Sequence, residues 1–203
     1  MNSSAETSHS YSGAAGVPVH IQTNGFILRN LTPTDATPQF LQWINSTEMQ
    51  TGLNLPPLNF THEKLVQFIK SFDNLNNYLI GIFDAQTQTL IGFYTLDVNL
   101  THKVANITTG IGESHYEGKG VLWATIDALL DHLFIYRDIY KVNARVLATN
   151  RRMIFNFIGN PRFSFAALLY KECVKLDGER VDILLFSAFQ NPEDTKKAGK
   201  FLL

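Results

Sequence analysis

Short runs of apolar residues mark several buried strands along the chain. The runs at 26–31 and 78–83 are apolar on both faces, as expected for strands covered from both sides. Two further runs, at 90–98 and 104–112, follow after short polar loops. The pattern therefore predicts three consecutive antiparallel strands over 78–112.

Four other segments carry the sequence features of helices. Thr37-Pro38 is typical of a helix start. The backbone N–H group that proline lacks would have no hydrogen-bond partner in the first turn of a helix. Thr61 can cap a second helix, and Gly120 opens a third, long one. On that long helix, large aliphatic residues fall on one face: Leu122, Ile126, Leu129, Leu130 and Leu133. A fourth, short helix is predicted over 151–158.

The last third of the chain predicts a strand and a hairpin. Apolar and polar residues alternate over 142–148. Asp177-Gly178 stands between two β-like runs, 163–176 and 181–188, which is typical of a hairpin because both turn residues accept a positive φ. The element order is β-α-α-β-β-β-α-β-α-β-β. It predicts an α+β fold with a mixed, mostly antiparallel sheet of about seven strands and about four flanking helices.

Composition indicates one folding unit with two polar ends. The chain has 203 residues, of which 45% are hydrophobic, enough for the core of one domain. Residues 1–24 are rich in Ser, Gly and Ala and are predicted to be flexible. Residues 25–190 are predicted to form the domain, and the polar tail 191–203 is predicted to fray.

Charge and cysteine content argue against several classes of protein. Lys and Arg number 17 against 18 Asp and Glu, without a basic block, so no nucleic-acid partner is expected. The single cysteine, Cys173, has no disulfide partner, and no histidines have metal-ligand spacing, so no metal site is predicted. No apolar run is long enough to span a membrane. The N-terminus lacks the features of a secretory signal, so a cytoplasmic location is expected.

The segment 110–121 has the features of an anion-binding turn. A predicted strand leads through Gly-x-Gly at 118–120 into the long helix, whose first amides are unpaired beside its positive dipole end. The amides of 115–121, with Lys119 at the mouth, would suit a phosphate or pyrophosphate. The alternative is that the glycines only permit a tight turn. Trp123 stands where a dinucleotide fingerprint needs its third glycine, and the spacing does not fit a P-loop.

Taken in order, these elements resemble the GNAT superfamily of acyl-CoA N-acyltransferases, and most closely its branch of ribosomal-protein N-terminal acetyltransferases. The resemblance covers about residues 25–190. Four stretches carry it: Gly25-Phe26-Ile27-Leu28-Arg29-Asn30-Leu31-Thr32 as the first strand, Leu90-Ile91-Gly92-Phe93 as the third-strand entry, His115-Tyr116-Glu117-Gly118-Lys119-Gly120 at the phosphate motif Arg/Gln-x-x-Gly-x-Gly/Ala, and Ala148-Thr149-Asn150 at the asparagine after the fifth strand.

The resemblance implies acetyl-CoA as the acyl donor. Its pyrophosphate is expected on the amides of residues His115, Tyr116, Glu117, Gly118, Lys119, Gly120 and Val121. Its pantetheine arm is expected between the strand end at Ile111 and Glu113 and the strand 141–148, where Asn150 would bond it. Arg151 and Arg152 either meet the ribose phosphate or remain solvated helix residues.

Two departures from the family pattern concern proton transfer. The glutamate base of many relatives aligns with Asn106, which cannot take a proton, and their tyrosine acid aligns with Phe157. Asp97 and Glu113 remain as candidates for proton handling, with a solvated structural carboxylate as the alternative for each. The positions assigned to catalysis are therefore Asn106 and Asp97.

The function that the resemblance implies is transfer of an acetyl group to a primary amine by direct attack on the thioester. The acceptor would be a protein N-terminus, a small amine or an amino sugar, and the enzyme a monomer or homodimer. The alternative is a non-catalytic protein that binds acyl-CoA. The implied acceptor wall is apolar and poor in carboxylates, which argues against a polyamine; it comprises Trp43, Leu53, Leu55, Pro56, Pro57 and Phe60.

Overall fold

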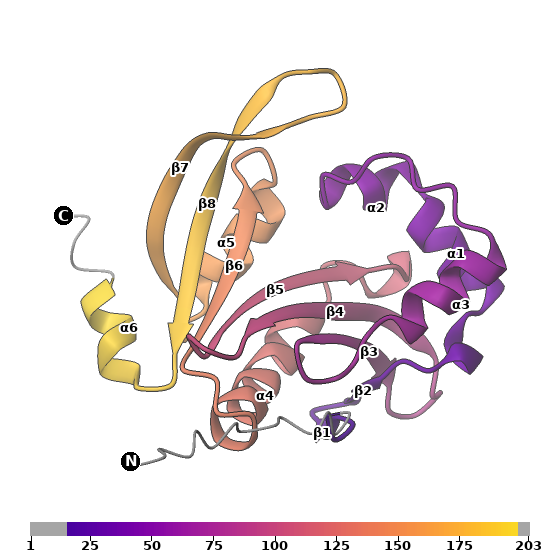
Figure 1. Cartoon of the computed structure of the whole chain (residues 1–203), viewed down its shortest axis with the longest axis horizontal. Helices are drawn as coiled ribbons and strands as arrows, with labels where there is room; N and C mark the ends of the chain where they lie inside the picture. Colours follow the sequence, from indigo (N-terminus) through magenta and orange to yellow (C-terminus); the bar gives the residue numbers. More distant parts are fainter. Residues whose placement is uncertain (1–15, 199–203) are drawn as a thin grey trace, which may run out of the picture.

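The centre of the protein is one eight-stranded sheet with the order β1-β2-β3-β4-β5-β6-β8-β7, seen in a computed structural model that describes residues 16–198. The strands are β1 His20–Thr23, β2 Phe26–Asn30, β3 Asn77–Asp84, β4 Leu90–Asn99, β5 Val104–Ile111, β6 Lys141–Leu147, β7 Ser164–Val174 and β8 Arg180–Phe189. Neighbours are antiparallel except β5 and β6, which run parallel. Figure 1 shows β6–β8 turning away from β3–β5. The predicted α+β fold with a mixed, mostly antiparallel sheet is confirmed, with one more strand than expected.

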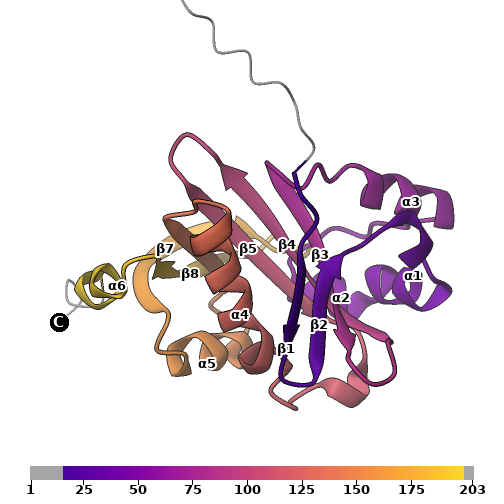
Figure 2. The ribbon, with the colours of Figure 1, turned by 90° about the horizontal axis from the view of Figure 1, so that it is seen from below.

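Helices pack on both faces of the sheet. They are α1 Pro38–Asn45, α2 Thr47–Gly52, α3 His62–Lys70, α4 Val121–Tyr136, α5 Arg151–Gly159 and α6 Pro192–Ala198, with single 3-10 turns η1 Pro33–Asp35 and η2 Ser114–Tyr116. Figure 2 shows α4 and α5 on one side of the sheet and α1–α3 at its β1–β4 end. Among the residues described, no helix combines the length and hydropathy that a membrane span requires.

Strand β3 shows why the sequence run at 78–83 is apolar throughout. Its residues Tyr78, Ile80 and Ile82 pack into the core under α4, whereas Leu79 and Phe83 pack into a second core under α1–α3. Alternate side chains of a strand point to opposite faces, so a strand between two cores is apolar at every position. The sheet is therefore held from both sides through β3.

Threonine side chains cap two helices at their predicted N-termini. The Thr37 side chain accepts a hydrogen bond from the Phe40 amide (3.2 Å), and the Thr61 side chain accepts one from the Lys64 amide (3.3 Å). Each cap satisfies a donor that the first turn leaves unpaired. These two predicted helix starts are confirmed.

The predicted flexible lead-in, 1–24, contains a strand in its described part. β1 pairs antiparallel with β2, so that Ile21 lies opposite Leu28. The turn between the two strands is Asn24-Gly25, a pair typical of two-residue hairpins. The prediction was wrong for these residues because four residues of strand are too few to stand out from a polar segment, whereas pairing with β2 stabilises them.

The predicted fraying tail, 191–203, also contains regular structure, since α6 occupies its described part. The Tyr140 hydroxyl donates a hydrogen bond to Asp194 Oδ2 (2.8 Å), and Thr195 is buried beside β8, where its hydroxyl accepts from the Phe189 amide (3.2 Å). The Tyr140–Asp194 bond joins residues 54 positions apart, so the local composition of the tail did not predict it. The folded part of the chain thus extends on both sides of 25–190.

Candidate active site

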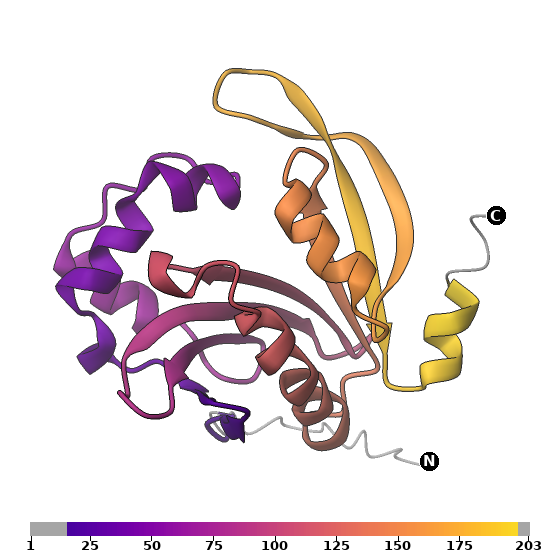
Figure 3. The same cartoon turned by 180° about the vertical axis from the view of Figure 1, so that it is seen from behind.

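The two parallel strands of the sheet separate along their length. β5 and β6 are paired from Val104↔Lys141 to Ile107↔Ala144, and no further. Beyond that point β5 continues to Ile111 and stays paired with β4, and β6 continues to Leu147 and stays paired with β8. The facing edges of β5 and β6 therefore lose their strand partners while the strands diverge (Figure 3). Backbone groups on such an edge are available to a ligand with amide groups of its own.

A cleft of about 1290 Å³ begins where the strands separate. Its walls are the end of β5, the turn before α4, the end of β6, the start of α5, helix α2 with its flanking residues, and part of the β7–β8 hairpin. We call the part at Gly118, Gly120 and Val121 the donor end, and the part at Trp43 and Glu48 the acceptor end.

Backbone amides are exposed for binding at the donor end. Gly118 and Gly120 are both left-handed, with φ of 69° and 72°, and a Cβ at either position would meet no atom within 4 Å. Glycine is needed there for its backbone conformation, not for space. The amides of Gly118, Gly120 and Val121 donate no hydrogen bond to any group in the described part of the chain. Together with the dipole of the 16-residue helix α4, they form a site for an anion.

The rest of the predicted amide group is partly used within the protein. The Tyr116, Glu117 and Lys119 amides donate to the backbone carbonyls of Glu113, Ser114 and Tyr116 at 2.9, 3.1 and 3.3 Å. They close the turn that includes η2. The open part of the 115–121 segment that lines the cleft is therefore smaller than the sequence predicted, and it is concentrated at the start of α4.

Charged side chains frame the donor end in pairs. Arg152 forms an ion pair with Glu117 (2.7 Å), which joins the start of α5 to the turn before α4. Lys119 Nζ lies 3.2 Å from His115 Nε2. The Asn150 side chain caps α5 by accepting a hydrogen bond from the Met153 amide (3.1 Å), and its amide nitrogen remains for a second contact.

The predicted donor-binding residues divide into two groups. Those that line the cleft are Ile111, Tyr116, Glu117, Gly118, Gly120, Val121 and Asn150, whereas Glu113, His115, Lys119 and Arg151 do not. Glu113 accepts a hydrogen bond from the Gln39 side chain. The Tyr116 hydroxyl donates to Asp84 Oδ2 (2.8 Å), and this bond raises the pKa of Tyr116.

Asn106 and Asp97 lie next to each other but outside the cleft lining. They face each other across β4 and β5, and Asn106 also lies opposite Asn143 of β6, at the closed end of the strand pair. Both side chains are exposed. Phe157, at the position of the family's tyrosine, is buried and packs against Phe163 and Phe186, with ring centroids 4.9 and 5.6 Å away.

Comparison with known protein families identifies the family of this chain. The family described as Acetyltransferase (GNAT) domain matches residues 26–154. The chain belongs to the GNAT acetyltransferase family. It is accordingly an acetyltransferase, and its acyl donor is acetyl-CoA. No curated protein sequence matches it.

Solved structures share this GNAT fold at low sequence identity. A spermidine N-acetyltransferase from Vibrio cholerae, in complex with CoA and spermine, has a TM-score of 0.72 and 22% identity, covering 82% of this chain and 96% of that chain. RimL, a ribosomal L7/L12 alpha-N-protein acetyltransferase, has a TM-score of 0.72 and 15% identity, covering 87% and 97%. A ribosomal-protein-S5-alanine acetyltransferase from Vibrio fischeri has a TM-score of 0.71 and 15% identity, covering 85% and 97%.

The acceptor end of this GNAT chain differs from the predicted wall. Of the six residues predicted, Trp43 and Leu53 line the cleft, and the Pro-rich segment after them does not. Helix α2, which was not predicted, supplies Glu48 and Met49 instead.

Gly110 in β5 and Gly112 directly after the strand allow α1 and α2 to approach this closely. A Cβ on Gly110 would lie 2.7 Å from Met49 Sδ, and one on Gly112 would overlap the Trp43 ring. Both glycines are on the same face of the strand, because they are two residues apart. This Gly-x-Gly was the sequence feature that could have placed Trp43 and Met49 over the end of β5.

Proposed function

We propose that the protein transfers the acetyl group of acetyl-CoA to a primary amine by direct attack on the thioester. The observation that carries the proposal is the continuity of the cleft, which joins free helix-terminal amides at one end to a wall of side chains at the other. A single cavity with both features can hold a phosphate-bearing donor and an acceptor at the same time.

The donor is assigned to backbone groups. The amides of Gly118, Gly120 and Val121 are suited to its pyrophosphate, because they are free and lie at the positive end of the α4 dipole. The separated edge of β5, from Thr108 to Ile111, is suited to the amide-bearing arm. The Asn150 side-chain nitrogen is available to the same arm. Lys119 lies between the two glycines of the donor end and Arg151 follows Asn150, and both would meet the phosphates.

The acceptor must reach the thioester as a neutral amine, since an ammonium group has no lone pair. Its nitrogen forms a bond to the carbonyl carbon, the carbon–sulfur bond breaks, the amine loses a proton, and the thiolate of CoA takes one up. Unpaired amides on the β5 edge would stabilise the oxyanion between these steps. Asp97 is proposed as the proton acceptor, acting through water, and Asn106 as a hydrogen-bonding group beside it.

Release of free thiol tests the proposal. The purified protein is incubated with acetyl-CoA and a panel of peptides with free N-termini, small monoamines and amino sugars, and CoA thiol is measured with time. Turnover with at least one amine, accompanied by its acetylated product, is expected. CoA binding by calorimetry without turnover on any amine would contradict the proposal and favour the non-catalytic alternative.

A further inference from the structure

The charges of the cleft leave one carboxylate without a partner. Four charged residues line it: Glu48, Glu117, Arg145 and Arg152. Arg152 is paired with Glu117 (2.7 Å), and Arg145 is paired with Glu172 of β7 (2.8 Å). The Glu48 side chain makes no ion pair or hydrogen bond with any residue between 16 and 198. It is therefore the lining carboxylate that is free to meet a cation.

The fold holds helix α2, which carries Glu48, against the end of β5. Its neighbour Met49 is buried and packs on Gly110, where a side chain on the glycine would overlap it. The Ser46 side chain caps α2 by accepting a hydrogen bond from the Met49 amide (3.2 Å). Helix α2 therefore carries Glu48 on the wall of the cleft at the place where β5 and β6 have separated.

The wall formed by β6 and the hairpin is apolar in this region. Apart from Arg145, whose charge is paired with Glu172, the lining residues of β6 and the hairpin are apolar, and Leu147, Ile183 and Cys173 among them form a small hydrophobic cluster with Val181. A second ammonium group of a polyamine would meet no carboxylate there, and its desolvation would go uncompensated. An acceptor with one amine and an apolar body matches both walls.

A hydrogen bond crosses the top of the cleft. The Asn54 side chain, at the end of α2, donates to the Val174 carbonyl at the end of β7 (3.3 Å). Asn54 is in the left-handed region, with φ of 53°, which turns the chain toward the hairpin. Figure 1 shows the tip of the hairpin reaching toward α2. The contact narrows access from this side, which favours a small acceptor over the terminus of a folded protein.

We infer that Glu48 binds the ammonium form of the acceptor and that the acceptor is a small primary monoamine with an apolar body. The inference rests on the proposed function and names the substrate class of the same cleft. Glu48 acts as a specificity-determining residue: the carboxylate collects the protonated amine from solution, and the apolar wall receives the rest of the molecule. The amine then loses its proton before attack.

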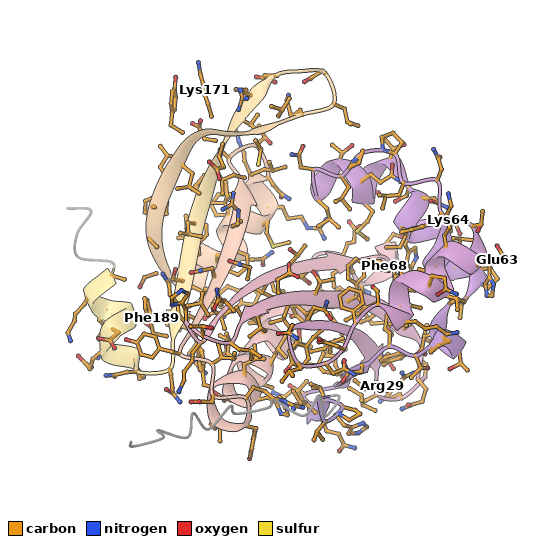
Figure 4. All side chains as sticks on the ribbon, in the orientation of Figure 1. Arg29, Glu63, Lys64, Phe68, Lys171 and Phe189 are labelled. Atoms are coloured by element: carbon orange, nitrogen blue, oxygen red, sulfur yellow. The ribbon has the colours of Figure 1, made fainter. Side chains whose placement is uncertain are left out.

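The test replaces one carboxylate and keeps a matched control. Glu48→Gln removes the charge with little change in shape. Glu63→Gln does the same in α3, where Glu63 also lies in the first turn of a threonine- or serine-capped helix but outside the cleft, on the outer side of the molecule (Figure 4). Both variants lose a carboxylate from the first turn of a helix, and Glu63→Gln also loses a hydrogen bond with Thr61 that lowers the pKa of Glu63. Only Glu48 lies in the cleft, so only Glu48→Gln is expected to change amine binding.

KM and kcat for acetyl transfer are measured with 2-phenylethylamine and with spermidine as probes. For Glu48→Gln we expect KM for 2-phenylethylamine to rise about tenfold, the loss of one charge-assisted contact, with kcat and CoA affinity unchanged. Glu63→Gln is expected to match the wild type. The wild type is expected to prefer 2-phenylethylamine to spermidine in kcat/KM.

Binding separates this inference from the proposed function. Affinity of each amine for the CoA complex is measured by calorimetry, which requires no turnover. A protein that binds 2-phenylethylamine through Glu48 but releases no thiol would contradict only the proposed function. Equal binding by wild type and Glu48→Gln, no binding of the amine at all, or a preference for spermidine would overturn the inference.

Discussion

The two ends of the cleft are built from different parts of the chain. The donor end consists of main-chain amides that one local segment, 114–121, presents at the start of α4. The acceptor end consists of side chains from α1, α2, β6 and the β7–β8 hairpin, which meet only in the folded protein. A main-chain site depends on backbone conformation, whereas a side-chain site changes with each substitution. Solved structures named for spermidine and for ribosomal proteins as acceptors share this fold.

The largest effect is expected when the backbone conformation of the donor end is changed. Gly118→Val forces a branched residue into a left-handed conformation (φ 69°), at a cost of about 1–2 kcal/mol or a shift of the turn. The free amides would then no longer point together, and CoA affinity is expected to fall more than a hundredfold. Calorimetric titration with CoA measures it.

Gly178→Val is the control for this strain. Gly178 has φ of 85° in the turn of the β7–β8 hairpin, and a Cβ there also meets nothing within 4 Å. The Gly178→Val variant should be destabilised to a similar extent as Gly118→Val, which thermal unfolding measures. Its CoA affinity should be unchanged. If Gly118→Val keeps full affinity, the pyrophosphate is not bound at the start of α4.

The second effect concerns proton transfer, which is proposed for Asp97 acting through water from outside the cleft lining. Asp97→Asn is expected to lower kcat at pH 7 about a hundredfold, the low end of what a general base contributes, with CoA affinity unchanged. The difference should shrink as pH approaches about 10, where an aliphatic amine is deprotonated by solvent alone. A pH profile of kcat for both proteins measures this. Parallel profiles with the same kcat would remove Asp97 from the mechanism.

A third, smaller effect separates the acceptor end from the donor end. Gly112→Ala places a methyl group in the Trp43 ring, so α1 must shift, and overpacking of this kind costs about 1–3 kcal/mol. KM for the amine is expected to rise severalfold while CoA affinity stays the same. Gly52→Ala, where nothing lies within 4 Å, is the stability control and should not lower the melting temperature. Loss of CoA affinity in Gly112→Ala would show that the two ends are not independent.

The same contrast explains how far the sequence could predict this molecule. The donor end follows from a Gly-x-Gly turn between a strand and a helix, features that are adjacent in the chain, and the structure brings Gly118, Gly120 and Val121 together with Asn150 around one cleft. The buried strands and helix caps also followed from local patterns. Glu48 and Asn54 did not, because their roles depend on Gly110 seating α2 and on a hairpin more than a hundred residues away. β1 and α6 were missed for the same reason, since tertiary contacts stabilise them.

The smallest effect is expected at Asp73, which lies outside both ends of the cleft. Its carboxylate is an anion that backbone amides of the same loop bind. One oxygen of the Asp73 carboxylate accepts hydrogen bonds from the amides of Leu75 (2.8 Å), Asn76 (2.8 Å) and Asn77 (3.1 Å). Burial alone would raise the pKa of Asp73, but the bond from the Asn76 side chain and these amide bonds lower it to about 2. In this loop, backbone amides bind the carboxylate of Asp73. The free amides of the donor end are proposed to bind a phosphate in the same way.

Asp73→Asn keeps the accepting oxygen and removes the charge. Because the pKa is depressed in the folded state, the charge stabilises the protein above the ordinary value of 3.8, and this contribution is lost as pH falls toward 2. The variant should be less stable than wild type at pH 7, by less than about 1 kcal/mol since the carboxylate is exposed to solvent, and the difference should vanish between pH 4 and pH 2. Denaturant unfolding at several pH values measures it. A difference that persists unchanged at pH 2 would mean that shape, not charge, holds this loop, and would weaken the case for amides as the anion site at the start of α4.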